Sequence, residues 1–567
     1  MTEFSVSCHR WLGGPFTGVG GLLPEIVPRI HREFPDLAAR HRHAILTIAP
    51  ELAEIVGTVP ETLTAAAPWE ERTRFQNGLA RRASHGVTEL LIAYAERGGP
   101  LRLTFEDVAE ADPTDQEFLE ILRRRADPEL VDVRLSTSEA TPDRREPADP
   151  EEALRDYVSR GYFSAAAELA AHAATVATGR QYRRFRALHA LSVRGTDPEL
   201  AEQILRDLRE RHPEPDVLMT TAYSLAMLYT TFHRPEHRDL GLARTLAREA
   251  IAVADQLGDP FARSFQRNGL ALVELRSRHP HDAFMLVTQA IKIVETELPE
   301  RAQQHRAVLY ANRARVHQSV SEPDKALRDF DVAIRLDPHF PDYHYDRARC
   351  AQLHGDDAAA IAGYEQAMAL SAPFPEPYYS RGDVRASQGD IAGALADFGY
   401  VLELDPDHLD ALVNRAALLA EIGNHVGAAV DVGHGLKLHP GNAHLLCTKG
   451  LLVMDQRPAF ARKLFEDALA ADPTLHPALV NTAILDYDAG DFDAAVDKLT
   501  RALAHAPTDP DLWFNRGFAH QAAGRFEAAA EDYRRALDLP GADRAELLHQ
   551  LGHCARQPVS APGRTPG

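Results

Sequence analysis

The C-terminal half of the chain repeats every 34 residues, and this period constrains the fold more than any other feature. Measured from the segment Ala307–Pro338, successive copies follow at intervals of 34, 34, 34, 34, 33 and 34 residues. A period of this length is typical of a helix–turn–helix unit that stacks on its neighbours into a solenoid. The copies begin at Ala307, Pro341, Pro375, Leu409, Ala443, His476 and Pro510.

Certain positions keep the same kind of residue from copy to copy. Proline closes five copies at position 32, where the second helix ends and a proline cannot continue it. Position 8 is always alanine or glycine, because the two helices of one unit must approach closely there. The residues at position 8 are Ala314, Ala348, Gly382, Ala416, Gly450, Ala483 and Gly517.

In this period and these positions the seven copies resemble tetratricopeptide repeats (TPRs). The resemblance implies a mainly α-helical protein, a right-handed superhelical solenoid preceded by a small α/β domain. A weaker skeleton persists upstream, and Arg544–Arg556 restarts the first-helix pattern and then stops, as a capping helix does. We therefore expect a small α/β domain over 1–137, a linker over 138–151, degenerate TPR-like repeats over 152–304, seven TPRs over 305–541, a capping helix over 542–556 and a disordered tail over 557–567.

A TPR solenoid presents the first helix of each unit on its concave surface, and position 6 should face that groove. Asparagine at this position can bind a peptide backbone, because its amide both donates and accepts hydrogen bonds. Such a row resembles the asparagine ladder of peptide-binding TPR proteins; the alternative is that asparagine is simply a soluble residue here. Asp346, Ser380 and Thr448 interrupt the row, which consists of Asn312, Asn414, Asn481 and Asn515.

Aromatic and acidic residues accompany this row. Tyr345, Tyr379 and Phe514 occupy position 5, where they are either anchors for a ligand or packing against the adjacent repeat. We predict that they bind peptide together with the four asparagines. The groove positions also collect carboxylates and few basic residues, which favours a neutral or basic ligand. The carboxylates are Asp342, Glu376, Asp383, Asp410, Glu421, Asp455, Asp488 and Asp511.

Arginine at position 7 has a structural explanation. Where position 7 is arginine, position 23 is usually aspartate, and the sixth copy has lost both partners. This covariation predicts an ion pair between the two helices of one unit rather than a ligand contact. The expected pairs are Arg313 with Asp329, Arg381 with Asp397, Arg415 with Asp431 and Arg516 with Asp532, whereas Arg347 faces Gly363.

The N-terminal region has a different pattern. A strand ending at Glu106 and Asp107, a helix and a second strand predict a βαβ unit. This segment resembles a truncated AAA/STAND-type signalling ATPase domain that lacks the phosphate loop. The glycine-rich segment Gly13–Gly21 has no GK[ST] motif, and no lysine precedes Lys292, so we expect a turn into a helix there. An unrelated small α/β domain is the alternative.

Composition excludes several classes of function. A net charge of −21 argues against nucleic-acid binding. No apolar run approaches ~18 residues and no signal peptide is evident, and the four cysteines lie far apart, so we expect a cytoplasmic protein with no membrane partner. Few lysines and many alanines are typical of a high-GC bacterium. Without GxSxG, HExxH or paired CxxC motifs, we expect neither an enzyme nor a bound cofactor or metal.

Two functional hypotheses follow. The first is a non-catalytic scaffold or adaptor that binds a peptide or partner protein in the TPR groove, as an accessory protein of a bacterial biosynthetic or regulatory system. On this hypothesis the N-terminal domain forms a homodimer or contacts a second partner. The alternative is a signalling regulator, derived from a repeat-bearing ATPase, that senses a nucleotide or ligand through Glu106 and Asp107.

Overall fold

A computed structural model of the chain describes residues 2–72, 78–137 and 147–556. It divides into two compact units, an upstream unit of Met1–Val384 and a downstream unit of Arg385–Gly567. The expected tail over 557–567 and residues 138–146 of the expected linker lie outside the described residues. The domain boundaries expected from the sequence stay predictions.

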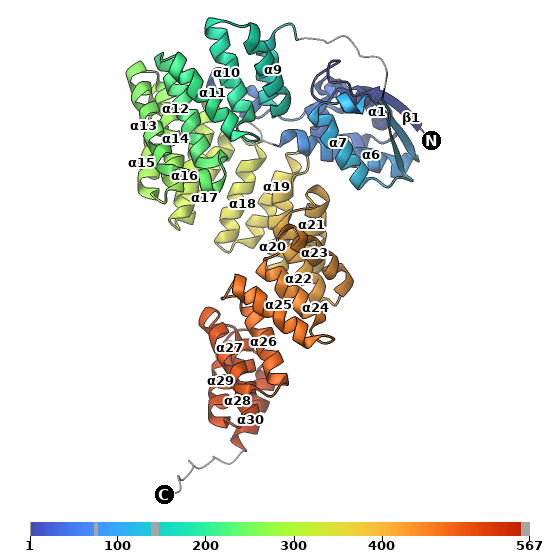
Figure 1. Cartoon of the computed structure of the whole chain (residues 1–567), viewed down its shortest axis with the longest axis vertical. Coiled ribbons are helices and arrows are strands. Elements are labelled where there is room, and N and C mark those ends of the chain that lie inside the picture. The colour runs from blue at the N-terminus through green and yellow to red at the C-terminus, as the bar shows by residue number, and fades with distance from the viewer. Residues whose placement is uncertain (1, 73–77, 138–146, 557–567) are drawn as a thin grey trace. The chain divides into compact units, whose positions relative to one another are not determined.

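The upstream unit begins with a small parallel sheet (Figure 1). Its strands β1 (Thr2–Ser7), β2 (Leu101–Glu106) and β3 (Val131–Leu135) pair in the order β1-β2-β3, with Leu101 opposite both Thr2 and Val131. Alternate residues of β2 are buried, as expected for a strand that packs on one face. The predicted strand–helix–strand pattern is confirmed, since helix α7 (Pro113–Arg125) connects β2 to β3.

The other helices of this region surround the sheet or extend from it. Leu22, Leu23 and Ile26 of α1 are fully or almost fully buried in its core. The remaining elements are α1 (Thr17–Glu33), α2 (Pro35–Arg40), α3 (Arg42–Ile48), η1 (Pro50–Leu52), α4 (Ala53–Val56), α5 (Leu63–Ala66), η2 (Trp69–Glu71), α6 (Leu79–Gly98) and η3 (Val108–Glu110).

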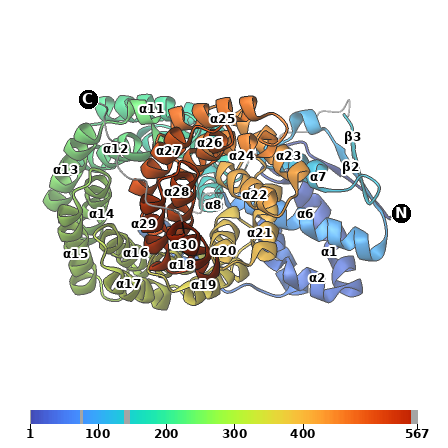
Figure 2. The same cartoon turned by 90° about the horizontal axis from the view of Figure 1, so that it is seen from below.

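The rest of the upstream unit consists of antiparallel helix pairs. Figure 2 shows α12, α14 and α16 on the inner side of a curved row, with α13, α15 and α17 outside. Many of these helices begin with proline after an aspartate whose side chain caps the first turn. The elements are α8 (Pro150–Ser159), α9 (Phe163–Val176), α10 (Gly179–Val193), α11 (Pro198–Arg211), α12 (Pro215–Met227), η4 (Leu228–Phe232), η5 (Pro235–His237), α13 (Leu240–Leu257), α14 (Pro260–Arg276), α15 (Pro280–Glu297), α16 (Gln303–Ser319), α17 (Pro323–Leu336), α18 (Pro341–Leu353), α19 (Asp357–Ala369) and α20 (Pro375–Ser387).

The downstream unit continues the helix pairs and shows why position 8 must be small. A Cβ added at Gly517 would lie 2.8 Å from the ring of Tyr533 on the paired helix. The fifth copy is one residue short in its turn, because α24 ends at Val453 and α25 begins at Pro458. The helices are α21 (Ile391–Leu404), α22 (Leu409–Glu421), α23 (His425–Leu438), α24 (Ala443–Val453), α25 (Pro458–Ala471), α26 (His476–Asp488), α27 (Phe492–His505), α28 (Pro510–Ala522), α29 (Phe526–Leu537) and α30 (Arg544–Ala555).

Candidate functional site

The arginines at position 7 hold the two helices of a unit together. Both oxygens of buried Asp431 accept hydrogen bonds from Arg415, at 2.6 and 2.7 Å. Arg313 binds Asp329 and Arg516 binds Asp532 in the same way. The predicted interhelical ion pairs are therefore confirmed at these three units.

The other units satisfy the same arginines differently. Arg347, which faces glycine in its own unit, binds Asp331 of the preceding unit at 2.7 Å. Arg381 likewise binds Glu365 at 3.1 Å. Arg385 binds Asp397 at 2.8 Å. These side chains are tied into the scaffold, which leaves the neighbouring position 6 as the better candidate for ligand contact.

Asn312 in the upstream unit uses its amide inside the fold. Its Nδ2 donates to Asn268 Oδ1 at 2.8 Å, and its Oδ1 accepts from Arg315 Nη1 at 2.7 Å. The residue is 6% exposed. Because both ends of the amide have partners and the side chain is buried, Asn312 acts here as a packing residue between consecutive first helices.

Asn481 and Asn515 in the downstream unit are in a different state. Both are half-buried. Asn481 Nδ2 makes one weak contact, 3.9 Å from Cys447 Sγ. Among the residues that the structure describes, none forms a hydrogen bond with the side chain of Asn515. Asn414 occupies the equivalent position of α22 and is also half-buried. Much of the hydrogen-bonding capacity of the last two amides thus remains for a ligand.

The aromatic residues differ in the same direction. Upstream, burial raises the pKa of the Tyr345 hydroxyl, which lies 3.4 Å from Ser380 Oγ of the next repeat. Its ring packs 5.7 Å from that of Tyr364. The packing explanation left open by the sequence fits this geometry. Tyr379 is half-buried on α20.

Phe514 belongs to an aromatic cluster on α26 and α28. It stacks on Phe518 with ring centroids 6.1 Å apart, and Phe518 stacks on Tyr487 at 5.4 Å. Phe518 is 37% exposed, although it is a large apolar side chain. Asp488 and Asp511, on the same two helices, are exposed. We call Tyr487, Phe514 and Phe518 the downstream aromatic cluster.

A segment of the N-terminal region docks on the upstream helices, which the sequence did not predict. Leu63 N–H donates to Asp337 at 3.0 Å, and Gln304 donates to Thr64 Oγ1 at 3.1 Å. Glu71 accepts from Arg301 and from the backbone of Ala302, both at 2.8 Å. Partners separated by more than 200 residues leave no local pattern from which this contact could be read.

The glycine-rich segment is not a phosphate loop. Gly18, Gly20 and Gly21 lie inside α1 rather than before it, which corrects the expectation of a glycine turn preceding the helix. The backbone N–H groups of Gly18 and Val19 donate to the fully buried carboxylate of Asp115, at 2.7 and 3.0 Å. A phosphate at a helix N-terminus would need such donors. Here the protein's own carboxylate uses them.

The acidic pair proposed for nucleotide sensing is also bonded within the fold. Glu106 Oε1 accepts from Ser5 Oγ at 2.9 Å, and Asp107 Oδ2 accepts from Ser7 Oγ at 3.0 Å. Both bonds link β1 to the end of β2. The pair therefore joins neighbouring parallel strands.

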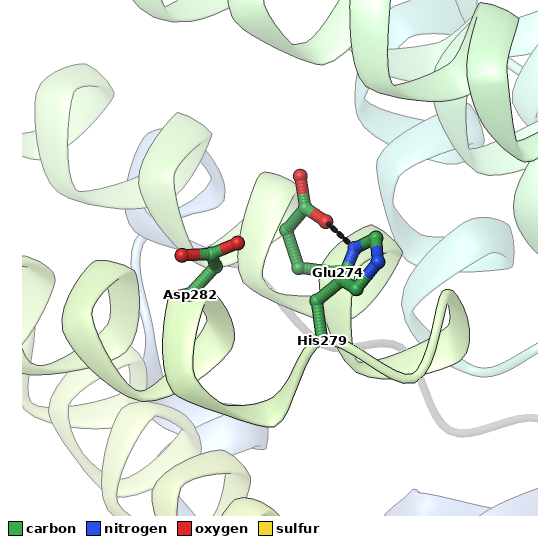
Figure 3. A group of neighbouring side chains, drawn as sticks. All are labelled: Glu274, His279 and Asp282. Atoms are coloured by element: carbon green, nitrogen blue, oxygen red, sulfur yellow. Dashed lines mark hydrogen bonds and ion pairs between the residues drawn. The ribbon is translucent and has the colours of Figure 1, made fainter.

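One cluster has the residue types of a metal site. Figure 3 shows Glu274 and His279 turned toward each other, with Asp282 on the next helix. The buried Glu274 carboxylate already receives two hydrogen bonds from Arg244, at 2.7 and 2.8 Å. His279 Nδ1 lies 2.9 Å from the same carboxylate. Because the Arg244 guanidinium balances this carboxylate, the cluster is explained as an ion-pair network.

Comparisons with known proteins identify the repeats. A family model described as tetratricopeptide repeat matches residues 312–375, 379–443 and 480–544. No curated protein matched the chain. Together with the observed helix pairs, the family match establishes TPR repeats in a helical solenoid. Within the described residues, no helix combines the length and apolar character needed to cross a membrane.

Several solved structures are similar to parts of the chain. A tetratricopeptide repeat protein from Parabacteroides merdae is 17% identical, covering 44% of this chain and 99% of its own, with a TM-score of 0.38. Yeast Tom70 is 14% identical over 72% of this chain and 94% of its own, with a TM-score of 0.32. YrrB, a TPR protein with an unusual peptide-binding site, is 22% identical over 34% and 95%, with a TM-score of 0.29.

Proposed function

We propose that this TPR-bearing chain is a non-catalytic scaffold that binds a peptide, or an extended segment of a partner protein, on the first helices of its downstream unit. The amides of Asn481 and Asn515 support this most directly, because they are half-buried and only weakly engaged by the rest of the fold. An amide in that state can pair with both the N–H and the C=O of a peptide backbone.

The downstream aromatic cluster supplies an apolar anchor beside these amides. Exposed aromatic side chains that stack on one another lose little conformational entropy on binding and often dominate the energy of an interface. The exposed carboxylates of Asp488 and Asp511 favour a basic partner over an acidic one. We infer a ligand that is neutral or basic and carries an aromatic or aliphatic side chain.

The proposed contact set is smaller than the one predicted from the sequence. Asn414, Asn481, Asn515 and Phe514 remain in it. The hydrogen bonds of Asn312 and the packing of Tyr345 favour structural roles for those two residues. A cytoplasmic location, a homodimer through the N-terminal domain and a place in a bacterial biosynthetic or regulatory system remain parts of the proposal.

Selection from random peptides displayed on phage tests this function without knowledge of the partner. We expect the full-length protein to enrich peptides of positive net charge that contain an aromatic residue. Calorimetry of an enriched peptide should show that Asn481→Ala with Asn515→Ala weakens binding by about tenfold or more.

Glu531→Ala, an exposed change on the outer helix α29, is the matched control and should leave the affinity unchanged. Circular dichroism should be the same for all three proteins. Equal affinity of the double variant, or enrichment of acidic peptides, would refute the proposed site.

A further inference from the structure

The inner face of the upstream helices contains a pocket of about 420 Å³. Arg180, Arg183 and Arg184 line it from α10, Tyr223 from α12 and Phe265 from α14, and Trp69 borders it from the N-terminal segment. Asp216 is the one acidic residue among those that line it within the described chain. The pocket is thus built from cationic and aromatic side chains in a protein whose net charge is −21.

The cationic side chains share one face of α10. Arg180, Arg183, Ala187, Leu191 and Arg194 follow one another at intervals of three or four residues, which places them on the same side of a helix. Four of them line the pocket, and Arg194 lies one turn beyond Leu191. The stripe therefore has arginine at both ends and apolar residues between.

Two of the arginines have partners and two do not. Arg183 forms an ion pair with Glu214 at 3.2 Å, and Arg184 with Glu151 at 2.5 Å. Across residues 2–72, 78–137 and 147–556, no carboxylate pairs with Arg180 or Arg194.

Arg194 is the more informative of the unpaired arginines. Its guanidinium lies 4.6 Å from the centroid of the Phe232 ring, and burial lowers its pKa. A partly buried cation without an anion carries an uncompensated desolvation cost, which a bound anion would offset.

The aromatic walls are held in place by close packing. Tyr223 lies 4.6 Å from Phe265 between ring centroids, and Gly269 makes room for it, since a Cβ there would stand 2.7 Å from the tyrosine ring. No hydrogen-bond acceptor for the Tyr223 hydroxyl lies within the part of the chain that the structure describes. Burial raises the pKa of this hydroxyl, which keeps it protonated as a donor.

The size and surroundings of the pocket favour a small molecule over a long peptide. A volume of this order falls within the range of sites for small organic ligands, about 300–1,000 Å³. The segment that carries Trp69 also contacts α16 through Thr64 and Glu71, so a peptide continuing along this inner face would meet it.

We propose that this pocket binds a small organic anion, a carboxylate or phosphate monoester with a flat apolar body. Arg180 and Arg194 bind the anionic group, the Tyr223 hydroxyl donates to it, and the rings of Trp69 and Phe265 contact the apolar body. This site is separate from the proposed peptide surface of the downstream unit and does not depend on it.

Calorimetry of the full-length protein with 1-naphthyl phosphate and 1-naphthoate tests the proposal. We expect saturable binding with a Kd on the order of 10–1,000 μM, as is usual for ligands of this size. The neutral 1-naphthalenemethanol and inorganic phosphate should each bind at least about tenfold more weakly, because each lacks half of the recognised chemistry.

Substitutions locate the site. Arg180→Gln and Arg194→Gln should each weaken binding by about tenfold. Arg328→Gln, at an exposed arginine of α17 outside the pocket, should have no effect. Arg180 is exposed, so its variant reports on the site even if Arg194→Gln impairs folding.

Four outcomes would overturn the proposal. They are no saturable binding of either anion up to about 10 mM, equal binding of the neutral analogue, equal binding of inorganic phosphate as an adventitious ion only, and unchanged affinity in folded Arg180→Gln.

Discussion

The upstream and downstream units contain the same repeat but use its inner helices in opposite ways. Upstream, Asn312 and Tyr345 bond to neighbouring repeats, and the segment around Glu71 docks on α16. Downstream, Asn515 keeps its amide and Phe518 its exposed ring. The position of a residue in a repeat therefore does not determine its role, because the neighbouring side chains decide whether it remains available.

The largest expected difference between the units concerns pH. Burial raises the pKa of Asp115 in the upstream unit to about 7, against about 3.9 in an unfolded chain. A carboxyl with a raised folded pKa contributes stability that is fully present below the unfolded pKa and is lost as pH rises through the folded pKa. Between pH 4 and 7 this contribution should fall by roughly 3–4 kcal/mol.

Urea unfolding of the wild type and of Asp115→Asn at several pH values measures it. The stability of the wild type relative to the variant should decrease from pH 4 to pH 7. A difference between the two proteins that is independent of pH would show that the buried carboxyl does not titrate in this window.

The ion pairs at position 7 should behave alike in the two units, which tests whether the scaffold itself is uniform. Arg313→Met upstream and Arg415→Met downstream each leave a buried aspartate without its bidentate partner. Each should cost about 3 kcal/mol. Native-state hydrogen exchange reports the affected helices separately. A twofold or larger difference between the two losses would mean that the comparison of the units has to include their frames.

The asparagines at position 6 should separate the units. Asn312→Ala leaves Asn268 and Arg315 without a partner and should destabilise α16 by about 2 kcal/mol. Asn515→Ala should change stability by less than about 0.5 kcal/mol, because its amide has no bond to lose. Hydrogen exchange of α16 and α28 gives both values. Equal losses would remove the distinction between a consumed and an available amide.

The sequence predicts the repeated part of the fold well, because each unit is defined by local spacing. Position 8 and the pair Arg415–Asp431 are fixed within one period, so a single sequence reveals them. The strand–helix–strand pattern around α7 is similarly local. What escaped prediction depends on residues far apart, such as the bond from Gly18 to Asp115 and the docking of Glu71 on Ala302.

The candidate sites show the same division. The asparagine row was visible, but nothing in the period indicated that Asn268 would engage Asn312. The upstream pocket left one signal, the four arginines within Arg180–Arg186 of an acidic chain. That signal becomes interpretable only when the fold brings Tyr223 and Phe265 beside them.

The docked N-terminal segment has a consequence for folding during synthesis. Helix pairs join residues close in sequence and form quickly, whereas Glu71 binds Arg301, 230 residues later. At 5–20 residues per second a ribosome needs roughly ten to fifty seconds to make that length of chain. The first segment to emerge thus completes its contacts among the last, and Trp69 waits in solvent until the helices that receive it exist.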